Sequence, residues 1–287
     1  MDATRKTEIV TDSSCDLSGE QLSRYGILMI SLRIVCQNAE YRDRIDIQED
    51  ELYELLTHEL PKTSLPLPED VSALYESLAQ EGVTDVIHIS ISSGLSGTFN
   101  MVRMITQDFE SRMRVHMVDS RTLSMGLGMM VLAAARALEE GATPEEAIER
   151  AQTVRRNQLG MFVIRTLEFL RKGGRIGKVE GVVGSLLQIK PIITFAPDGQ
   201  LQSVAKVRGR HQVMRKLVDM AVDRCGEHKR YNLAVAHGGA PEEMETVRQM
   251  LTEALPNSDH LWDGEIDGTL SVYIGDGVLG AAVQVLD

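Results

Sequence analysis

Aromatic residues are scarce in this sequence of 287 residues. Phe, Trp and Tyr together make up 4% of the chain, with a single tryptophan, whereas methionines number 14. The core must therefore consist mostly of aliphatic side chains, with flexible thioethers filling the gaps between them. Positive charge is also in deficit, and the net charge of −12 argues against general binding of nucleic acids, which requires a basic surface.

Cysteines and long apolar runs are lacking as well. Cys15, Cys36 and Cys225 are odd in number and widely spaced, which favours a reduced, cytoplasmic setting over a disulfide framework. The seven histidines form no H-E-x-x-H motif and no cluster with cysteine, so no metal site is indicated. No apolar run approaches the ~18 residues of a membrane-spanning helix, and the first residues lack a signal-peptide core. We therefore expect a cytoplasmic protein without stable membrane insertion.

Acidic and basic residues are unevenly distributed. Residues 155–216 contain 13 Lys/Arg and only 3 Asp/Glu, a net charge of +10. A basic middle segment in an acidic protein predicts a docking face for an acidic or phosphate-carrying partner. The alternative is that acidic residues on neighbouring surfaces neutralise it, and the sequence leaves both open.

Strands and helices alternate through the first half of the chain. The apolar runs 8–11, 85–90 and 115–118 are typical of buried strands, and helical patterns follow them. This order predicts an N-terminal domain, residues 1–158, with a mainly parallel sheet flanked by helices. Within it, Ile27–Val35 is expected as one strand and Lys62–Pro68 as a rigid, extended linker.

The second half has a different character. A turn signal at Ala196–Gly199 joins two strand-like runs as a hairpin, and further strands and helices follow. We expect an α+β domain over residues 159–287.

A loop of small hydroxyl residues and glycines, Ser92–Thr98, follows an apolar run and precedes a helical pattern. A strand, a small polar loop and a helix start together expose backbone N–H groups beside hydroxyls, which suits an anionic head group. The loop contains no lysine, acid or histidine, so we expect it to hold an anion rather than to carry out acid–base chemistry. Asp12–Asp16 and Asp119–Thr122 are expected at the same edge of the sheet, where α/β proteins form their ligand crevice.

Other motifs are weaker. Gly275-x-Gly277-x-x-Gly280 matches a dinucleotide fingerprint as text, but only seven residues follow it, too few for the required helix and strand. The segment Lys172–Lys178 lacks the glycine spacing of an ATP-binding loop. The serines of Ser92–Thr98 lack both the nucleophile-elbow motif and an identifiable base, which argues against a hydrolase.

The segment Ser124–Leu132 is apolar nearly all round and contains three methionines and two glycines. A buried core helix has this composition, and so does a helix that lines an apolar tunnel. The two interpretations are compatible, because a lipid tunnel is a core with room left in it.

Several segments, in this order and spacing, resemble the DegV family of bacterial fatty-acid-binding proteins over nearly the whole chain. They are Thr11–Leu17, Lys62–Ser64 with Pro66 and Pro68, Ser92–Thr98, Leu170–Ile176, Lys190–Ile192 with Gly199, and Lys206-x-Arg208-Gly209. Each segment is weak evidence alone, whereas the ordered set is specific.

The resemblance implies a two-domain α/β protein that holds one long-chain fatty acid in an apolar tunnel between its domains. It implies a carboxylate held by Thr63 and Ser93, with Ser64 and Gly94 as neighbours, and neither a cofactor nor a metal.

Some members of the family present the bound fatty acid to a separate kinase, which makes acyl-phosphate for phospholipid synthesis. By this resemblance the chain is a binding protein rather than an enzyme, and Arg175 and Arg208 belong to the face that meets the kinase.

The C-terminal segment departs from the family pattern. The family usually has histidine and proline where this chain has Tyr273 and Asp276. The phenol of Tyr273 can still donate a hydrogen bond to a head group, but its charge state differs from that of histidine. Two alternatives stay open: an enzyme acting on a small acid or phosphate at the same hydroxyl loops, and a regulatory protein whose lipid is a structural filler.

Overall fold

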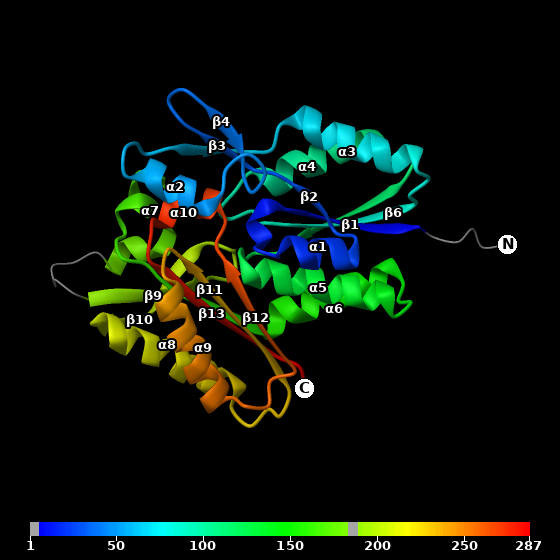
Figure 1. Cartoon of the computed structure of the whole chain (residues 1–287). Coiled ribbons are helices and arrows are strands. Elements are labelled where there is room, and N and C mark those ends of the chain that lie inside the picture. The colour runs from blue at the N-terminus through cyan, green and yellow to red at the C-terminus, as the bar shows by residue number, and fades with distance from the viewer. Residues whose placement is uncertain (1–5, 183–188) are drawn as a thin grey trace.

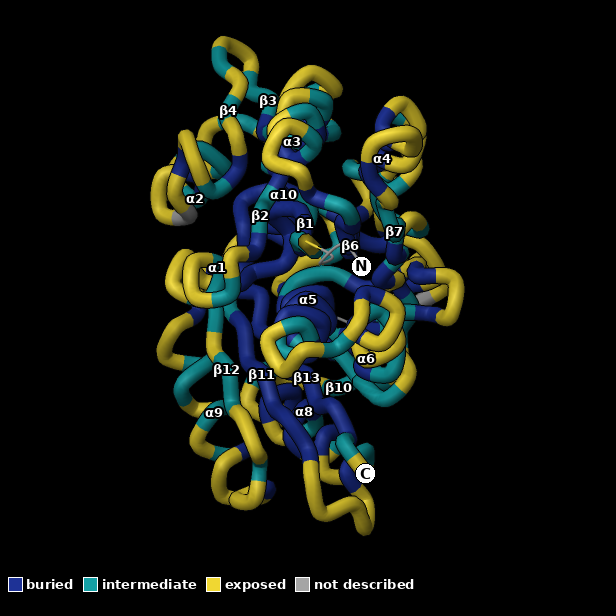
Figure 2. Tube along the Cα trace, turned by 90° about the vertical axis from the view of Figure 1, so that its right-hand side faces the viewer, coloured by how far each residue is buried: buried dark blue, intermediate teal, exposed yellow. Residues whose placement is uncertain are grey.

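The chain folds into stacked layers of helices and sheets (Figure 1). The computed structural model describes residues 6–182 and 189–287. A helical layer covers a parallel sheet, a second helical layer separates this sheet from a larger mixed sheet, and a third covers the far face of the mixed sheet (Figures 1 and 2). The predicted fold class, with one parallel sheet and a separate mixed sheet, is confirmed.

The four-stranded sheet, which lies uppermost in Figure 1 and is called the upper sheet, is parallel throughout. Its strand order is β2 (Leu28–Ile30), β1 (Thr7–Asp12), β6 (Asp85–Ser90) and β7 (Arg114–Asp119). Helices α3 (Pro68–Gln80) and α4 (Thr98–Thr106), with the 3-10 turn η2 (Gln107–Phe109), pack on one face. The other face is covered by α1 (Gly19–Tyr25), α5 (Met125–Glu139) and α6 (Pro144–Asn157). Strand β6 is buried at every position, as a strand with both faces covered must be.

The mixed sheet, which lies below the first in Figure 1 and is called the lower sheet, has six strands. Their order is β10 (Leu201–Arg208), β9 (Ile189–Phe195), β8 (Gln158–Val163), β13 (Val278–Val285), β11 (Tyr231–Gly238) and β12 (His260–Glu265). All neighbours are antiparallel except β11 and β12. Helices α8 (Arg210–Cys225) and α9 (Pro241–Ala254) cover its outer face, while α5 and α6 lie against its inner face.

A small third sheet, built from the first half of the chain, packs against a helix from the second half. It contains β4 (Glu40–Arg42), β3 (Arg33–Val35) and β5 (Lys62–Ser64), and α2 (Glu49–Leu56) lies beside it. Helix α10 (Gly268–Ile274) comes from the C-terminal half, yet it packs against α2, β3 and β5. The remaining short elements are η1 (Ser13–Cys15), α7 (Glu168–Lys172) and η3 (Gly177–Val182).

Two local expectations are wrong. Ile27–Val35 is not one strand, because β2 pairs with β1 in the upper sheet whereas β3 turns away to pair with β4 and β5. The first residues of the expected linker are strand β5, and its second proline, Pro68, is the first residue of α3. A proline at the start of a helix lacks only an N–H that would be unpaired there anyway.

The strands of the two larger sheets separate along the chain. All strands of the parallel sheet end by Asp119, and all strands of the six-stranded sheet begin at Gln158 or later. The predicted boundary at residue 158 lies between the strands of the two sheets. The two halves nevertheless pack together, because α10 of the second half contacts α2, β3 and β5 of the first.

Candidate binding site

An apolar cavity of about 100 Å³ lies between the two larger sheets, at the start of α5. One wall consists of β5 and the loops that follow β6 and β7, and the opposite wall is the inner face of β8, β11 and β13. Residues of α7 and α10 close one end. The cavity therefore lies between the two halves of the chain, where a ligand tunnel is expected.

Small residues on the lower sheet create this space. Two neighbouring rows across three strands line the cavity: Gly160, Ala282 and Ala234 in one, and Phe162, Gly280 and Ala236 in the next. Residues two apart in a strand share a face, so both rows point into the cavity. Phe162 is the exception in size, and its ring packs 6.2 Å from that of Phe195 between ring centres.

Hydroxyl groups line the opposite wall. Thr63 comes from β5, Ser96 from the loop after β6, and Thr122 and Ser124 from the loop after β7. Their hydrogen bonds within the protein include Ser124 Oγ to Asp16 at 2.5 Å and Ser96 to Thr98 at 2.9 Å. The same wall also presents Leu32, Ile91, Leu95 and Leu123, and it carries no buried cation among the described residues that line it.

Asp12 holds these loops in place. Its fully buried carboxylate accepts hydrogen bonds from the N–H of Ile91 at 2.7 Å, from Ser90 Oγ at 2.9 Å and from Ser14 Oγ at 2.5 Å. Burial raises the pKa of Asp12, and these hydrogen bonds counteract part of that rise. The sequence places Asp12 at this edge of the sheet, but its support of the loop after β6 is visible only in the structure.

At the end of the cavity closed by α10, Thr63 and Tyr273 meet. Their hydroxyl oxygens are 2.5 Å apart. The guanidinium of Arg175 lies over the Tyr273 ring at 4.7 Å from its centre, and both residues line the cavity. Gly173 makes room for the ring, because a Cβ there would lie 2.3 Å from Cδ1 of Tyr273. Tyr273 therefore lies at the cavity beside Thr63, and its role near a head group stays a prediction.

The other predicted head-group residues lie outside the lining of the cavity. Ser93 donates its hydroxyl to Asp119 at 2.6 Å and its backbone N–H to the same carboxylate at 3.1 Å. The hydroxyl loop therefore does hold a carboxylate, and that carboxylate belongs to the protein. Gly94 approaches another backbone so closely that a Cβ would lie 2.6 Å from the carbonyl oxygen of Asp198, and Ser64 is exposed on β5.

The loop shows no arrangement for hydrolysis. Ser92 donates to the carbonyl of Gly199, Ser93 to Asp119, and Ser96 pairs with Thr98. None of these hydrogen bonds involves a histidine, which a serine nucleophile commonly uses as its base. Within residues 6–182 and 189–287, no group of three or more His, Cys, Asp or Glu side chains is placed to hold a metal ion. Over the same ranges, no helix combines the length and the apolarity needed to cross a membrane.

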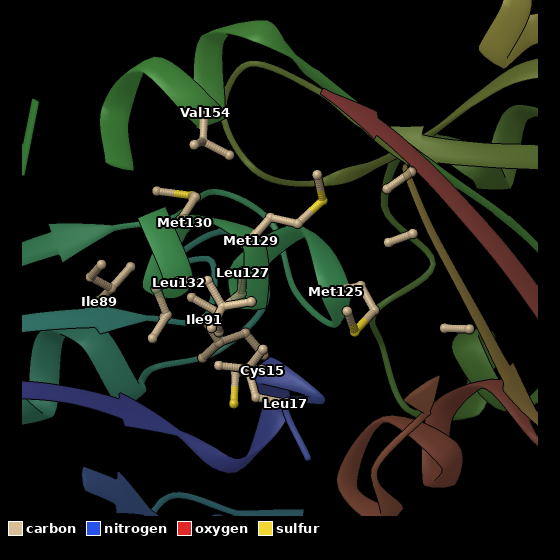
Figure 3. Close-up of a cluster of buried hydrophobic side chains, with 14 of the residues drawn as sticks. Cys15, Leu17, Ile89, Ile91, Met125, Leu127, Met129, Met130, Leu132 and Val154 are labelled. Atoms are coloured by element: carbon tan, nitrogen blue, oxygen red, sulfur yellow. The ribbon is translucent and has the colours of Figure 1, made fainter. Parts of the chain in front are cut away.

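The apolar helix α5 contributes side chains to a buried hydrophobic cluster (Figure 3), and its start also lines the cavity. Met129, Met130 and Leu132 are at most 1% exposed and belong to the main hydrophobic cluster. Only the start of the helix reaches the cavity, through Leu123–Gly126. The core interpretation therefore applies to most of this helix, and the tunnel interpretation to its first turn.

The basic segment is only partly neutralised. Arg165 pairs with Asp276, Lys178 with Asp198 at 2.6 Å, and Arg210 with Glu243 at 2.6 Å. The negative charge that Asp276 adds therefore lies beside a cation at the surface. Arg175 and Arg208 are exposed and form no salt bridge within the described part of the chain.

Sequence reasoning missed most of the cavity lining. It did not single out Ser96 over Ser93, and it missed the small residues of the lower sheet. Gly280 belongs to the rejected dinucleotide motif and lines the cavity from β13, whereas Gly275 and Gly277 form a turn, with φ of +68° and +76°. Glycines at positive φ permit the sharp reversal from α10 into β13.

The sequence also matches known proteins along nearly its whole length. A profile of the family described as "Uncharacterised protein, DegV family" matches residues 6–285. A DegV domain-containing protein of Clostridium perfringens is 38% identical over 280 residues, which cover 98% of this chain and 99% of that protein.

Two solved structures share the fold. A DegV family protein of Thermus thermophilus, described by its fatty acid binding, has a TM-score of 0.91 at 29% identity and covers 98% of this chain and 100% of its own. DegV of Bacillus subtilis, described as a fatty acid binding protein, has a TM-score of 0.90 at 26% identity, with 99% and 100% covered. The family profile and the full-length relatives confirm the resemblance: this chain belongs to the DegV family.

Proposed function

We propose that this protein binds one long-chain fatty acid in the cavity between its sheets, with the carboxylate at the Thr63–Tyr273 end. The observation that carries the proposal is the contrast between an apolar cavity wall of small residues and an end where the hydroxyls of Thr63 and Tyr273 meet. The fatty acid binding described for the Thermus thermophilus and Bacillus subtilis relatives supports the same ligand class.

The tail supplies most of the binding free energy. Each buried methylene contributes ~0.8 kcal/mol, so a tail of about fifteen carbons contributes ~12 kcal/mol before the costs of association. An apolar cavity of about 150 Å³ accommodates one benzene molecule, so the 100 Å³ present here is too small for such a tail. We infer that side chains such as Phe195 and Met125 move aside, or that the two walls separate, when the lipid enters.

The head group needs hydrogen bonds rather than a buried cation. A carboxylate loses several kcal/mol of hydration when buried, and hydroxyl donors offset that loss. Thr63 and Tyr273 place two hydroxyls at one point, where one donates to the other and the second keeps a proton for the ligand, and Ser96 lines the same cavity. The predicted donor Ser93 could join them only by giving up its hydrogen bond to Asp119.

We further propose that the protein presents its lipid to a separate fatty-acid kinase, which would supply nucleotide and metal. The exposed side chain of Arg175 beside the cavity supports a docking face there, and Arg208 is the second predicted docking residue. The Arg208→Ala variant, which leaves the cavity lining intact, should retain its lipid and lose kinase-dependent acyl-phosphate formation. Unchanged acyl-phosphate formation would reject this docking face.

The direct test of lipid binding uses the purified protein. We expect denaturation and mass spectrometry of the extract to release about one long-chain fatty acid per chain, and added palmitate to raise the melting temperature of stripped protein. An extract without lipid, together with no thermal shift, would contradict the proposal.

A further inference from the structure

Four ionisable side chains cluster at the first turn of α10. Asp267, Asp43 and Asp16 are 0%, 1% and 3% exposed, and Arg44 is half-buried beside them. Asp16, Arg44 and the neighbouring Ser124 are three of the four non-glycine residues with positive φ among those described. Such conformations persist only where the surrounding structure holds them, and they concentrate at functional sites.

The carboxylate of Asp43 accepts hydrogen bonds from the first residues of α10. Its Oδ1 accepts the N–H of Gly268 at 3.0 Å, and its Oδ2 accepts the hydroxyls of Thr269 at 2.8 Å and Ser13 at 2.7 Å. A Cβ at position 268 would lie 2.8 Å from Cδ1 of Ile34 and 3.0 Å from Oδ1 of Asp43. Glycine therefore permits this close approach.

Asp267 caps the same helix and has one unsatisfied oxygen. Its Oδ1 accepts the N–H of Leu270 at 3.0 Å, and its backbone N–H donates to Asp16 at 2.9 Å. Its Oδ2 is buried without a hydrogen-bond partner among the described residues, in a site where the carboxylates of Asp16 and Asp43 accept the backbone N–H groups of residues 267 and 268. Two carboxylates can form a hydrogen bond only when one of them carries a proton.

We infer that Asp267 and Asp43 share one proton, with Asp267 as the neutral acid and Asp43 as the acceptor, and that this pair positions Tyr273 at the end of the cavity. The proton gives Oδ2 of Asp267 a partner and removes one negative charge from a buried site. The inference rests on the proposed function, because the position of Tyr273 matters only if it receives the head group.

The connection from the acid pair to Tyr273 runs through α10 itself. A helix of seven residues has little stability of its own, so its neighbours must fix its position. The acid pair holds its first turn, the hydroxyl of Tyr53 contacts Ser271 at 2.9 Å, and Tyr273 contacts Thr63 at the far end. A displaced first turn would therefore shift Tyr273.

The other ionisable groups around α10 do not supply the proton that Asp267 and Asp43 are inferred to share. The Cys15 thiol beside Arg44 is buried, which raises its pKa to about 12 and keeps it neutral. On β3, Arg33 pairs with Glu40 at 2.8 Å. The remaining charged side chains described on the elements packed against α10 are exposed: Asp50, Glu51 and Glu54 of α2, Lys62 of β5, and Glu168, Arg171 and Lys172 of α7.

The acid pair predicts a pH dependence with a definite sign. Burial, followed by the charges of Asp43 and Asp16, raises the pKa of Asp267 well above its usual range, and burial raises the pKa of Asp16 to about 6. A carboxyl with a raised pKa stabilises the fold fully at low pH, and this contribution is lost as the pH rises from about 4 through the folded-state pKa. Ionised Asp267 then repels Asp43 beneath α10, so we expect lipid affinity to fall as the pH rises.

The Asp267→Asn variant tests the inference, because its amide can accept from Leu270 and donate to Asp43 as the protonated acid does. We expect palmitate affinity to fall by about tenfold as the pH rises from neutral to alkaline in the wild type and to stay level in Asp267→Asn. Asp85→Asn is the matched control. It also removes a buried carboxyl, but at the start of β6, where Asp85 contacts His116 at 3.0 Å, and it should keep the wild-type profile.

Infrared spectroscopy gives a readout that needs no ligand. A carboxylic-acid C=O band should be present at neutral pH, weaken in Asp267→Asn and persist in Asp85→Asn. This result separates the inference from the proposed function, because it holds even if palmitate does not bind. If Asp267→Asn does not fold, Asp43→Asn should weaken the same band, since an amide at 43 can donate to an ionised Asp267. A band unchanged in the folded variant, or a pH dependence of palmitate affinity that survives in Asp267→Asn, overturns the inference.

Discussion

The two walls of the cavity differ in what they contribute. The upper wall, from β5 and the loops after β6 and β7, presents hydroxyl groups such as Thr63, Ser96 and Ser124. The lower wall, from β8, β13 and β11, presents almost no polarity and little bulk, with residues such as Ala234, Ala282 and Gly280. Under the proposed function, the upper wall receives the head group and the lower wall leaves room for the tail.

The largest effect should come from filling the lower wall. Ala282→Leu places three additional carbon atoms in the cavity, so part of the lipid tail can no longer enter. Excluding about four methylenes costs ~3 kcal/mol, a loss of palmitate affinity of roughly a hundredfold. Calorimetry on stripped protein measures it, with Val222→Leu on the exposed side of α8 as the control. Wild-type affinity in Ala282→Leu would show that the tail does not lie along this wall.

A smaller effect is expected from the upper wall. Thr63→Val keeps the shape of the side chain and removes its hydroxyl, which leaves a buried carboxylate one donor short. A hydrogen bond to a charged group contributes ~1.5–3 kcal/mol, so palmitate affinity should fall at least about tenfold. The corresponding change at the exposed Thr57 is the control. An equal effect of both variants would place the head group elsewhere.

The smallest effect should follow from Ser93→Ala, because the Ser93 hydroxyl already donates to Asp119. We expect at most about a threefold loss of palmitate affinity, below the range of a lost bond to the ligand charge. A loss as large as that of Thr63→Val would show that Ser93 leaves Asp119 to bind the lipid, as the sequence predicts. The Thr63→Val/Ser93→Ala double variant should then lose more than either single variant.

The same contrast between walls explains what the sequence could and could not predict. Local hydrophobic periodicity indicates the order of strands and helices, so the parallel sheet and the hydroxyl loops at its edge could be predicted. Thr63 stands in a short family motif, whereas Tyr273 departs from another, and their place at the cavity is seen only in the folded chain. The small residues of β8, β11 and β13 carried no signal, because alternating Gly and Ala in a strand also occur in a filled core. Whether space remains above them depends on α5 and the loops opposite, which only the folded chain brings together.

Long-range contacts also limited what the sequence could predict about the acid pair and about strands β2 and β3. Asp43 and Asp267 lie in different halves of the sequence, and neither stands in a motif that suggests a partner. The break between β2 and β3 was hidden as well, because the apolar pattern runs from one strand into the next while their pairing partners differ. In each case the deciding interaction joins residues that local patterns cannot connect.

A structure of the protein with bound palmitate tests the central claim most directly. The account predicts one carboxylate oxygen within about 3 Å of the Thr63 hydroxyl, and the acyl chain running along Ala234, Gly280 and Ala282 of the lower sheet. A carboxylate bound at another place, or a tail lying outside the space between the two sheets, would contradict it.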